Sequence, residues 1–261
     1  MTFTLPSSSR LELIDHIIKF CSITPPSKGN KHSLRDWQHI AGWLNWSFNA
    51  YPLLRPSLNN LYPKISGKDS PNAMIWVNQL VRDDLLWAAD HLHTSSGVYL
   101  LRATNWQAAN TNIVIYCDAC IHGMGFWYPN EDLAFYSPSP LGIPNNVIFY
   151  YEALCVLSSL HHVTSRTRNI SRIAIFTDNS NTVDIFNSLC ALPSYNNLLK
   201  SAVDVLLCTD HQLRVFHVPG HLNLVADCIS RKNFAHALQI RPHLSIDLFQ
   251  PPQVTMGAAK K

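Results

Sequence analysis

The chain has 261 residues, of which 14% are charged and 47% hydrophobic, and its formal net charge is +3. Average soluble chains carry about 25% charged residues, so this composition excludes a disordered charged tail and argues against a histone-like DNA-binding protein. No apolar run of about 18 residues occurs, the N-terminus lacks the pattern of a secretory signal, and the seven cysteines form no dense framework. We therefore expect a globular intracellular protein with reduced thiols.

The first predicted helix lies early in the chain. Apolar residues at helical spacing predict a helix over residues 34–47, with Ser33 as its N-cap and an end near Ala50, where prolines begin to interrupt the pattern. This segment carries a cluster of three tryptophans: Trp37, Trp43 and Trp46. We expect their rings to pack a small helical core, and a platform for stacking nucleic-acid bases is the alternative.

A second amphipathic helix is expected over residues 73–92, after a start signal at Ser70 and Pro71. A short extended segment at residues 98–101 then leads to a boundary near residues 105–112. The first part of the chain is thus predicted to be mainly helical.

The pattern after this boundary changes to alternating strands and helices. Strands are predicted at 112–117, 123–128, 133–137, 172–177 and 212–218, and helices at 146–163, 180–189, 196–208 and 223–231. Three antiparallel strands followed by alternating helices and strands are typical of a mixed α/β sheet with helices packed on it. The proline-containing tail from about Phe234 is expected to be a loosely held extension.

The charge is divided unevenly between these parts. Residues 1–110 hold ten Lys and Arg against seven Asp and Glu, whereas residues 111–261 hold ten of each. We therefore expect units with different roles: residues 1–108, residues 109–233, and a C-terminal extension at residues 234–261.

Four acidic residues stand in apolar surroundings. Asp118 and Asp178 each follow a predicted buried strand, at the sheet edge where ligands bind in α/β proteins, although either one alone is more typical of a turn residue. Glu152 and Asp227 each interrupt an otherwise apolar helical stretch, and an unpaired carboxylate is costly to bury. Two divalent ions would relieve the repulsion between four converging carboxylates, and oxygen ligands suit Mg²⁺ or Mn²⁺.

The same four residues carry a resemblance to a known family. Asp118 lies in Cys-Asp-Ala-Cys-Ile-His-Gly-Met-Gly, Glu152 in Tyr-Glu-Ala-Leu, Asp178 in Phe-Thr-Asp-Asn-Ser, and Asp227 in His-Val-Pro-Gly-His-Leu-Asn-Leu-Val-Ala-Asp-Cys-Ile-Ser-Arg. In this order, over about residues 111–233, the motifs resemble the type 1 ribonuclease H domain of retrotransposon reverse transcriptases. The resemblance implies an α/β fold with a ribonuclease H-like mixed sheet flanked by helices.

The first part of the chain extends this resemblance. Its segments Leu-Arg-Asp-Trp-Gln-His-Ile-Ala-Gly-Trp-Leu-Asn-Trp and Tyr-Pro-Leu-Leu-Arg-Pro resemble the connection segment between the polymerase palm and the ribonuclease H domain. The similarity is closest in character to retroelements that use a tyrosine recombinase. No Tyr-x-Asp-Asp polymerase motif occurs in the chain, so no DNA synthesis is expected, and a palm and fingers could be supplied by another chain.

The resemblance also implies a reaction. The substrate would be the RNA strand of an RNA–DNA hybrid, selected by groove shape and 2′-hydroxyls, and the products would carry a 5′-phosphate and a 3′-hydroxyl. Asp118 would bridge two Mg²⁺ ions, Glu152 and Asp178 would complete the ion at the leaving oxygen, and Asp227 would help hold the ion that activates water.

Further residues are weaker candidates. His221 precedes Asp227 in a loop, where it is either a catalytic histidine or an exposed loop residue, whereas His217 is expected to point into or cap the sheet. Asn179 and Ser180 either cap the following helix or contact nucleic acid. The basic side chains between the predicted helix and strand form a solvated face or contact phosphates: Arg166, Arg168 and Arg172.

Cys117 and Cys120 with His217 and His221 have a spacing that could suggest zinc, but zinc is disfavoured, because the Cys pair brackets a strand-end aspartate and the second half of a Cys-x-x-Cys site is missing. Two alternatives to a ribonuclease are considered. A catalytically weak nucleic-acid-binding relic with the same fold would retain the domain without hydrolysis. A DNA-cutting integrase or transposase is disfavoured, because such enzymes normally use three acids.

Overall fold

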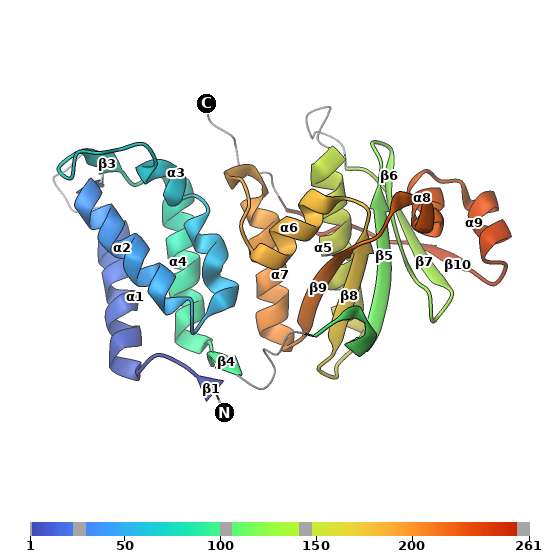
Figure 1. The fold of residues 1–261 in the computed structure, drawn as a ribbon, viewed down its shortest axis with the longest axis horizontal. Coiled ribbons are helices and arrows are strands. Elements are labelled where there is room, and N and C mark those ends of the chain that lie inside the picture. The colour runs from blue at the N-terminus through green and yellow to red at the C-terminus, as the bar shows by residue number, and fades with distance from the viewer. Residues whose placement is uncertain (1, 23–29, 100–105, 141–147, 255–261) are drawn as a thin grey trace. The chain divides into compact units, whose positions relative to one another are not determined.

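The computed structural model describes residues 2–22, 30–99, 106–140 and 148–254 (Figure 1). These residues divide into two units. Unit 1 contains the described residues up to Tyr99 together with Cys190–Asn196, and unit 2 contains Trp106–Leu189 and the residues from Asn197 to Val254. The assignment of functions to residues 1–108, 109–233 and 234–261 is not tested by this division and stays a prediction.

Unit 1 is built mainly from helices. Its elements are β1 (Thr2–Phe3), α1 (Ser7–Cys21), β2 (Lys31–Ser33), α2 (Leu34–Ser47), the 3₁₀ helix η1 (Pro52–Leu58), α3 (Tyr62–Ile65), β3 (Met74–Trp76), α4 (Gln79–Thr94), β4 (Val98–Tyr99) and the 3₁₀ helix η3 (Pro193–Tyr195). Helix α2 begins as predicted, because Ser33 and Asp36 form a reciprocal capping box, and it ends at Ser47, slightly before Ala50.

The predicted start of the second helix is wrong. Residues Met74–Trp76 form strand β3, which pairs antiparallel with Lys31–Ser33 of β2 and buries Ile75. Helix α4 begins only at Gln79, because the Asn78 side chain accepts a hydrogen bond from the Val81 backbone N–H and caps it.

The three tryptophans have different surroundings. Trp37 is fully buried and packs the core of unit 1, as predicted. The Trp43 ring is partly buried beside those of His16 and His39, and Trp46 is 58% exposed. The prediction of a packed helical core is therefore right for Trp37 and wrong for Trp46.

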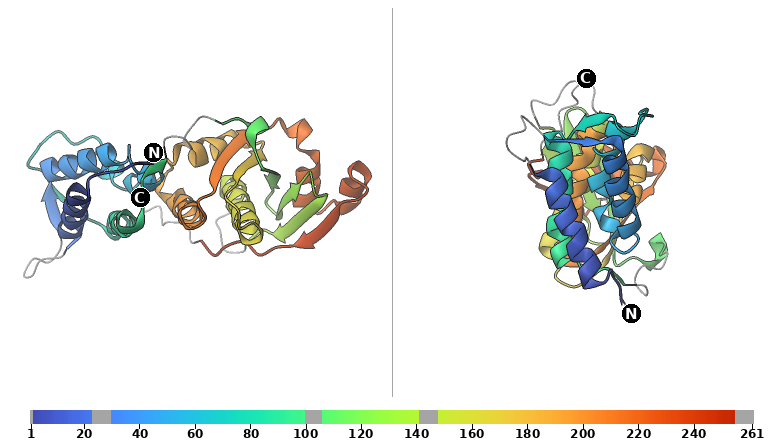
Figure 2. Two further views of the ribbon diagram at one scale, coloured as in Figure 1. Left: turned by 90° about the horizontal axis from the view of Figure 1, so that it is seen from below. Right: turned by 90° about the vertical axis from the view of Figure 1, so that its left-hand side faces the viewer.

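Unit 2 contains a six-stranded sheet with helices packed on it (Figure 1, Figure 2). Its elements are the 3₁₀ helix η2 (Ala108–Asn110), β5 (Ile113–Ala119), β6 (Gly123–Tyr128), β7 (Leu133–Pro138), α5 (Ile148–Arg166), β8 (Arg172–Thr177), α6 (Ser180–Ser188), α7 (Asn196–Thr209), β9 (Gln212–His217), the 3₁₀ helix η4 (Gly220–Leu222), α8 (Leu224–Ser230), α9 (Phe234–Ile240) and β10 (Ser245–Leu248). The first residue of α7, Asn196, belongs to unit 1. The predicted α/β class, a mixed sheet flanked by helices, is confirmed.

The strand order is β10-β7-β6-β5-β8-β9. Strands β5, β6 and β7 are mutually antiparallel, whereas β8 and β9 continue the sheet parallel to β5. Side chains alternate across the sheet, so Cys117 faces Ser159 of α5 while Asp118 faces Ser230 of α8 on the other side. The two helices thus pack against opposite faces of β5.

The expectation of a loosely held tail is wrong for residues 234–254. Strand β10 pairs in parallel with β7, and Ala237 and Leu244 are buried in one cluster with residues of β7 and α8. Farther along, the Tyr150 hydroxyl of α5 donates a hydrogen bond of 2.7 Å to the Val254 carbonyl. The final residues, 255–261, lie outside the described part of the chain. Among the described residues, no helix has both the length and the apolar character needed to span a membrane.

Candidate metal centre

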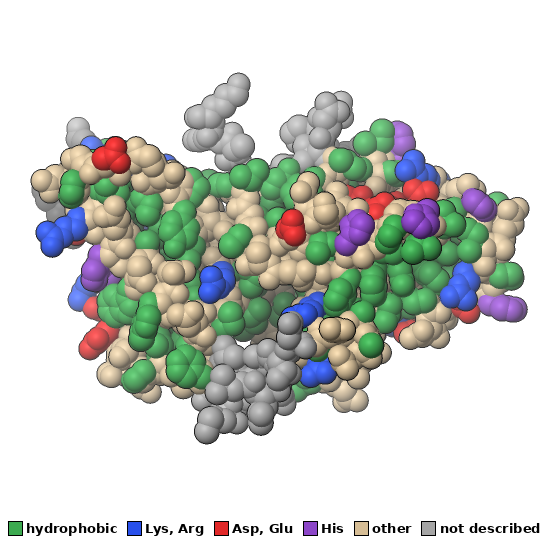
Figure 3. Space-filling view, in the orientation of Figure 1, with side chains coloured by type: hydrophobic (Ala, Val, Ile, Leu, Met, Phe, Trp, Pro, Cys, Tyr) green, Lys and Arg blue, Asp and Glu red, His purple; other side chains and the backbone are tan. Residues whose placement is uncertain are grey.

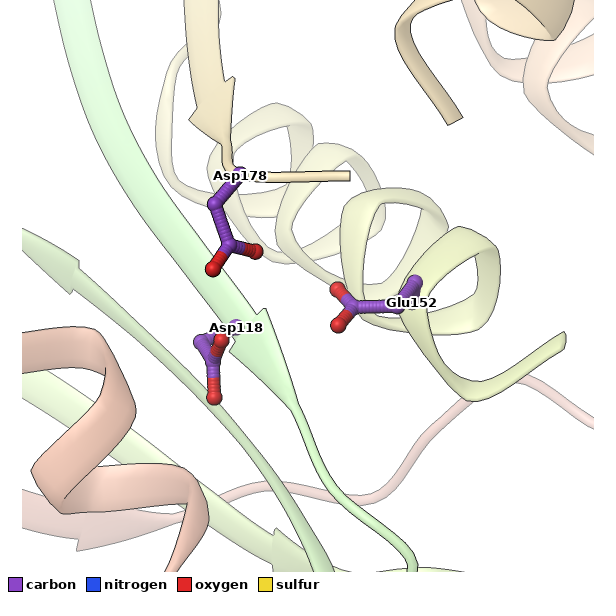
Figure 4. Close-up of side chains that lie close together, drawn as sticks. All are labelled: Asp118, Glu152 and Asp178. Atoms are coloured by element: carbon purple, nitrogen blue, oxygen red, sulfur yellow. The ribbon is translucent and has the colours of Figure 1, made fainter. Parts of the chain in front are cut away.

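Three of the four predicted acids meet at one edge of the sheet in unit 2. Asp118 lies near the end of β5, Asp178 directly follows β8, and Glu152 is in the first turns of α5 (Figure 4). Because β5 and β8 are parallel, with Tyr116 opposite Phe176, Asp118 and Asp178 extend from neighbouring strand ends. One carboxylate oxygen from each of the three residues lies within 4.8 Å of the others.

Glu152 combines burial with a carboxylate oxygen that has no hydrogen-bond partner. Its side chain is buried at 5% exposure and accepts a hydrogen bond from the Ala119 backbone, but Oε2 has no hydrogen-bond partner. Burial, followed by the negative charges of Asp118 and Asp178, raises the pKa of Glu152 to about 9. A buried carboxylate with an open oxygen is costly, and a bound cation would remove that cost.

Asp118 has a similar environment with one compensating contact. Burial raises the pKa of Asp118 to about 7; a hydrogen bond from the Ser230 hydroxyl opposes this rise, and the charges of Asp178 and Asp227 add to it. Asp178 is exposed, so the group opens to solvent on its side. Figure 3 shows acidic side chains at the surface of unit 2 with histidine side chains beside them.

Helix α8 carries the fourth predicted acid and packs directly on β6. A Cβ atom on Gly125 would lie 2.7 Å from the Ser230 backbone N and 2.6 Å from Ile229, and one on Gly123 would lie 2.5 Å from the Ser230 carbonyl oxygen. Only glycine therefore allows this close approach. Asp227 itself is partly exposed, lies outside the three-residue group, and accepts a hydrogen bond of 2.6 Å from Arg231 Nε.

The donor set fits a hard divalent cation. All three members of the group offer carboxylate oxygens, and within the described ranges no Lys or Arg forms an ion pair with any of them. Uncompensated carboxylates and the open Oε2 of Glu152 are the chemistry that Mg²⁺ or Mn²⁺ would satisfy. Asp118, Glu152 and Asp178 are the residues that could hold it.

The described residues do not support the zinc alternative, because their one group of three or more metal-ligating side chains is the acidic group. Cys117 and Cys120 are buried and donate to Ser159 Oγ and the Ser230 carbonyl. His217 and His221 are exposed. Of the two predicted positions of His217, exposure contradicts the one that points into the sheet, whereas a position capping the sheet agrees with its place as the last residue of β9.

The other predicted site residues have the following surroundings. Asn179 caps α6 by accepting a hydrogen bond of 3.0 Å from the Thr182 N–H, and Ser180 is the exposed first residue of that helix. Arg166 pairs with Glu131 at 2.7 Å, whereas Arg168 is exposed. Their contacts with nucleic acid, and the catalytic role of His221, remain predictions.

The sequence reasoning missed Ser230 and the two glycines of β6. The spacing of Ser230, three residues after Asp227 in a predicted helix, was the available signal, since residues three apart share a helix face. Nothing in the local sequence shows that this face contacts Asp118, which lies 112 residues away.

No protein-family model matches the sequence, and a search of curated proteins finds no significant match. Among solved structures, the chain is similar to RNase H1 from the halophilic archaeon Halobacterium salinarum, with 14% identity over 48% of this chain and 98% of that chain and a TM-score of 0.38. It is also similar to LC11-RNase H1 in complex with an RNA/DNA hybrid, with 18% identity over 49% of this chain and 99% of that chain and a TM-score of 0.36. A foamy viral protease-reverse transcriptase in complex with an RNA/DNA hybrid matches 87% of this chain and 50% of that chain, with 11% identity and a TM-score of 0.36.

Proposed function

We propose that unit 2 is a metal-dependent endonuclease that hydrolyses the RNA strand of RNA–DNA hybrids. The observation that carries this proposal is the buried Glu152, whose Oε2 lacks a partner beside Asp118 and Asp178. When its carboxyls are ionised, such an arrangement destabilises the metal-free protein, and a bound cation would offset that cost. The order of the four acidic motifs, which resembles type 1 ribonuclease H domains, supports the choice of substrate.

The three carboxylates would have different roles, because two of them are buried and one is exposed. Glu152 and Asp118 would provide buried, fixed oxygens, while the exposed Asp178 lies on the side from which a phosphate can approach. Divalent ions held there would supply charge stabilisation at the attacking and leaving oxygens. A water oxygen would bond to phosphorus as the bond to the 3′ oxygen breaks, which leaves a 5′-phosphate and a 3′-hydroxyl.

The proposal has five finer parts. Mg²⁺ would be the working ion, with Mn²⁺ as a substitute, and Asp227 would join the site as a further ligand. Unit 1 would act as the connection segment of a reverse transcriptase from a tyrosine-recombinase retroelement. A polymerase palm and fingers would come from another chain, and the protein would act inside the cell.

The test is a cleavage assay of the full chain with Mg²⁺ on labelled RNA–DNA hybrid, single-stranded RNA and duplex DNA. We expect cleavage of the hybrid alone, and its loss in EDTA or in the Asp178→Asn variant. Asp247→Asn, which neutralises an exposed acid on β10, is the matched control and should cleave normally. No cleavage by the wild-type chain would favour the nucleic-acid-binding relic, and cut duplex DNA would favour an integrase-like nuclease.

A further inference from the structure

Ser230 connects the helix that carries Asp227 to the buried carboxylate of Asp118. It is the last residue of α8 and is 1% exposed. Its hydroxyl donates a hydrogen bond to Asp118 Oδ2 and also lies 2.9 Å from the Asp227 carbonyl oxygen. One side chain therefore touches two of the four residues predicted to form the metal centre.

The single hydroxyl hydrogen can serve only one of these acceptors at a time. The Asp227 carbonyl already accepts the backbone N–H of Arg231 at 3.1 Å, as expected at a helix end. A carbonyl oxygen can accept two hydrogen bonds, but the contact to Asp118 is the shorter of the two and a carboxylate is the stronger acceptor, so we assign the Ser230 hydrogen to Asp118. This contact occupies one oxygen of the carboxylate and fixes its rotation about the Cβ–Cγ bond.

The backbone around Ser230 is held tightly against the sheet. Gly123 and Gly125 let the Ser230 main chain approach β6, and Cys120 Sγ donates to the Ser230 carbonyl at 3.3 Å. The hydroxyl therefore projects from a fixed point, not from a loop that could follow the carboxylate. A rigid donor of this kind can impose an orientation on its partner.

We infer that Ser230 is a positioning residue of the metal centre: it holds the Asp118 carboxylate in the orientation that a divalent cation requires. It would act through Asp118, and the residues that could hold the cation are Asp118, Glu152 and Asp178. This inference rests on the cation site of the proposed function, but not on the identity of the nucleic-acid substrate.

The test compares Ser230→Ala with Ser158→Ala in the full chain. Ser158 is also a buried helical serine of unit 2, but its hydroxyl donates only to the Leu154 carbonyl, so the control removes the same atom away from the carboxylates. Mg²⁺ binding is measured by titration calorimetry without substrate, and hybrid cleavage is measured over a range of Mg²⁺ concentrations. Ser230→Thr restores the hydroxyl with one added methyl group.

We expect Ser230→Ala to weaken Mg²⁺ binding by about tenfold, with a matching rise in the Mg²⁺ needed for half-maximal cleavage. Ser158→Ala should bind Mg²⁺ like the wild type, and Ser230→Thr should bind it more tightly than the alanine variant. Equal Mg²⁺ affinity in Ser230→Ala and Ser158→Ala would overturn the inference, as would a wild-type chain that binds no Mg²⁺. A wild type that binds Mg²⁺ without cutting the hybrid would contradict only the proposed function.

Discussion

Both units of the molecule bury carboxylates, but Asp84 of unit 1 and Glu152 of unit 2 have different hydrogen-bond partners. In unit 1, Asp84 is 2% exposed, and its Oδ2 accepts hydrogen bonds from the side-chain amides of Asn60 at 2.7 Å and Asn196 at 2.8 Å. In unit 2, Glu152 is buried to a similar degree, yet its Oε2 has no partner and its neighbours are two further acids. Burial alone therefore does not distinguish a carboxylate of a functional site from a structural one.

The difference lies in what surrounds the charge. Neutral amide donors satisfy Asp84 within the protein, so this carboxylate stabilises the packing of unit 1 and needs nothing from solution. The group around Glu152 is stable as a set of anions only when a cation is added. The first arrangement is expected to matter for folding and the second for binding and chemistry, and the following changes test that distinction.

The largest expected effect is the loss of cleavage in Glu152→Gln. Removing one of the three converging charges should lower hybrid cleavage by at least about 1000-fold, equivalent to about 4 kcal/mol, because divalent-ion stabilisation of the transition state is lost. The same variant should unfold at a higher temperature than the wild type in EDTA at pH 8, because the wild-type carboxyl, whose pKa is raised to about 9, must take up a proton on folding, whereas the amide is already neutral. Cleavage rates test the predicted loss of activity, and thermal unfolding tests the predicted gain in stability. A variant that is both inactive and less stable would count against the metal-centre interpretation.

Asp84→Ala should have the opposite profile. Two buried amides lose their shared acceptor, which should lower the free energy of unfolding by about 2–4 kcal/mol. Mg²⁺ affinity should be unchanged, because Asp84 belongs to unit 1. Urea unfolding and calorimetric titration measure the two quantities.

Asp83→Ala is the matched control for this change, since Asp83 is the exposed neighbour on the same helix. Its unfolding free energy should stay within about 0.5 kcal/mol of the wild type. A loss as large as that of Asp84→Ala would mean that burial and amide pairing are not what makes Asp84 important.

Local patterns in the sequence predicted most of unit 2. The boundaries of β6 and β8 agree with the predicted residues 123–128 and 172–177, because both strands are short apolar runs that end at turn or polar residues. Asp118 and Asp178 could be predicted to meet, since parallel strand ends lie at one edge of a sheet. Glu152 and Asp227 are added to them because each interrupts an apolar helical stretch, and only Glu152 joins the three-residue group.

Contacts between distant segments could not be predicted in the same way. Strand β10 depends on the free edge of β7, about 110 residues earlier in the chain, and its own sequence Ser-Ile-Asp-Leu has little strand character. The start of α4 was missed because the pairing of β3 with β2 takes Met74–Trp76 out of the helical pattern. In both cases tertiary pairing decided the conformation of a short segment.

Metal-free stability should depend on pH with a sign set by the two buried acids of unit 2. The pKa of Asp118 is raised to about 7 and that of Glu152 to about 9, so between pH 4 and 9 the folded state binds more protons than the unfolded state. This contribution to stability is fully present below the unfolded pKa values and is lost as pH rises toward 9. Mg²⁺ should offset the loss, and at 100 times its dissociation constant it would add about 2.7 kcal/mol.

Thermal unfolding at pH 5, 7 and 9, with EDTA or Mg²⁺, measures this dependence. The difference between the two conditions should widen as pH rises, and Glu152→Gln should reduce it. A gap that is constant with pH would show that the cation does not compete with protons on these carboxylates.

The smallest expected effect concerns Arg231, which pairs with Asp227 outside the three-residue group. The side chains of Arg231 and Asp227 are 62% and 38% exposed, so solvent screens the pair and Arg231→Gln should change the unfolding free energy by less than about 0.5 kcal/mol.

The Mg²⁺ affinity should also change in Arg231→Gln. The charge of Asp227 already raises the pKa of Asp118, so removing its partner increases the negative potential at the group and should tighten Mg²⁺ binding by about two- to threefold at low salt. If Asp227 is a ligand of the cation, Asp227→Asn should weaken Mg²⁺ binding by more than Arg231→Gln strengthens it. If the two variants change the Mg²⁺ affinity by equal and opposite amounts, Asp227 acts only as a nearby charge.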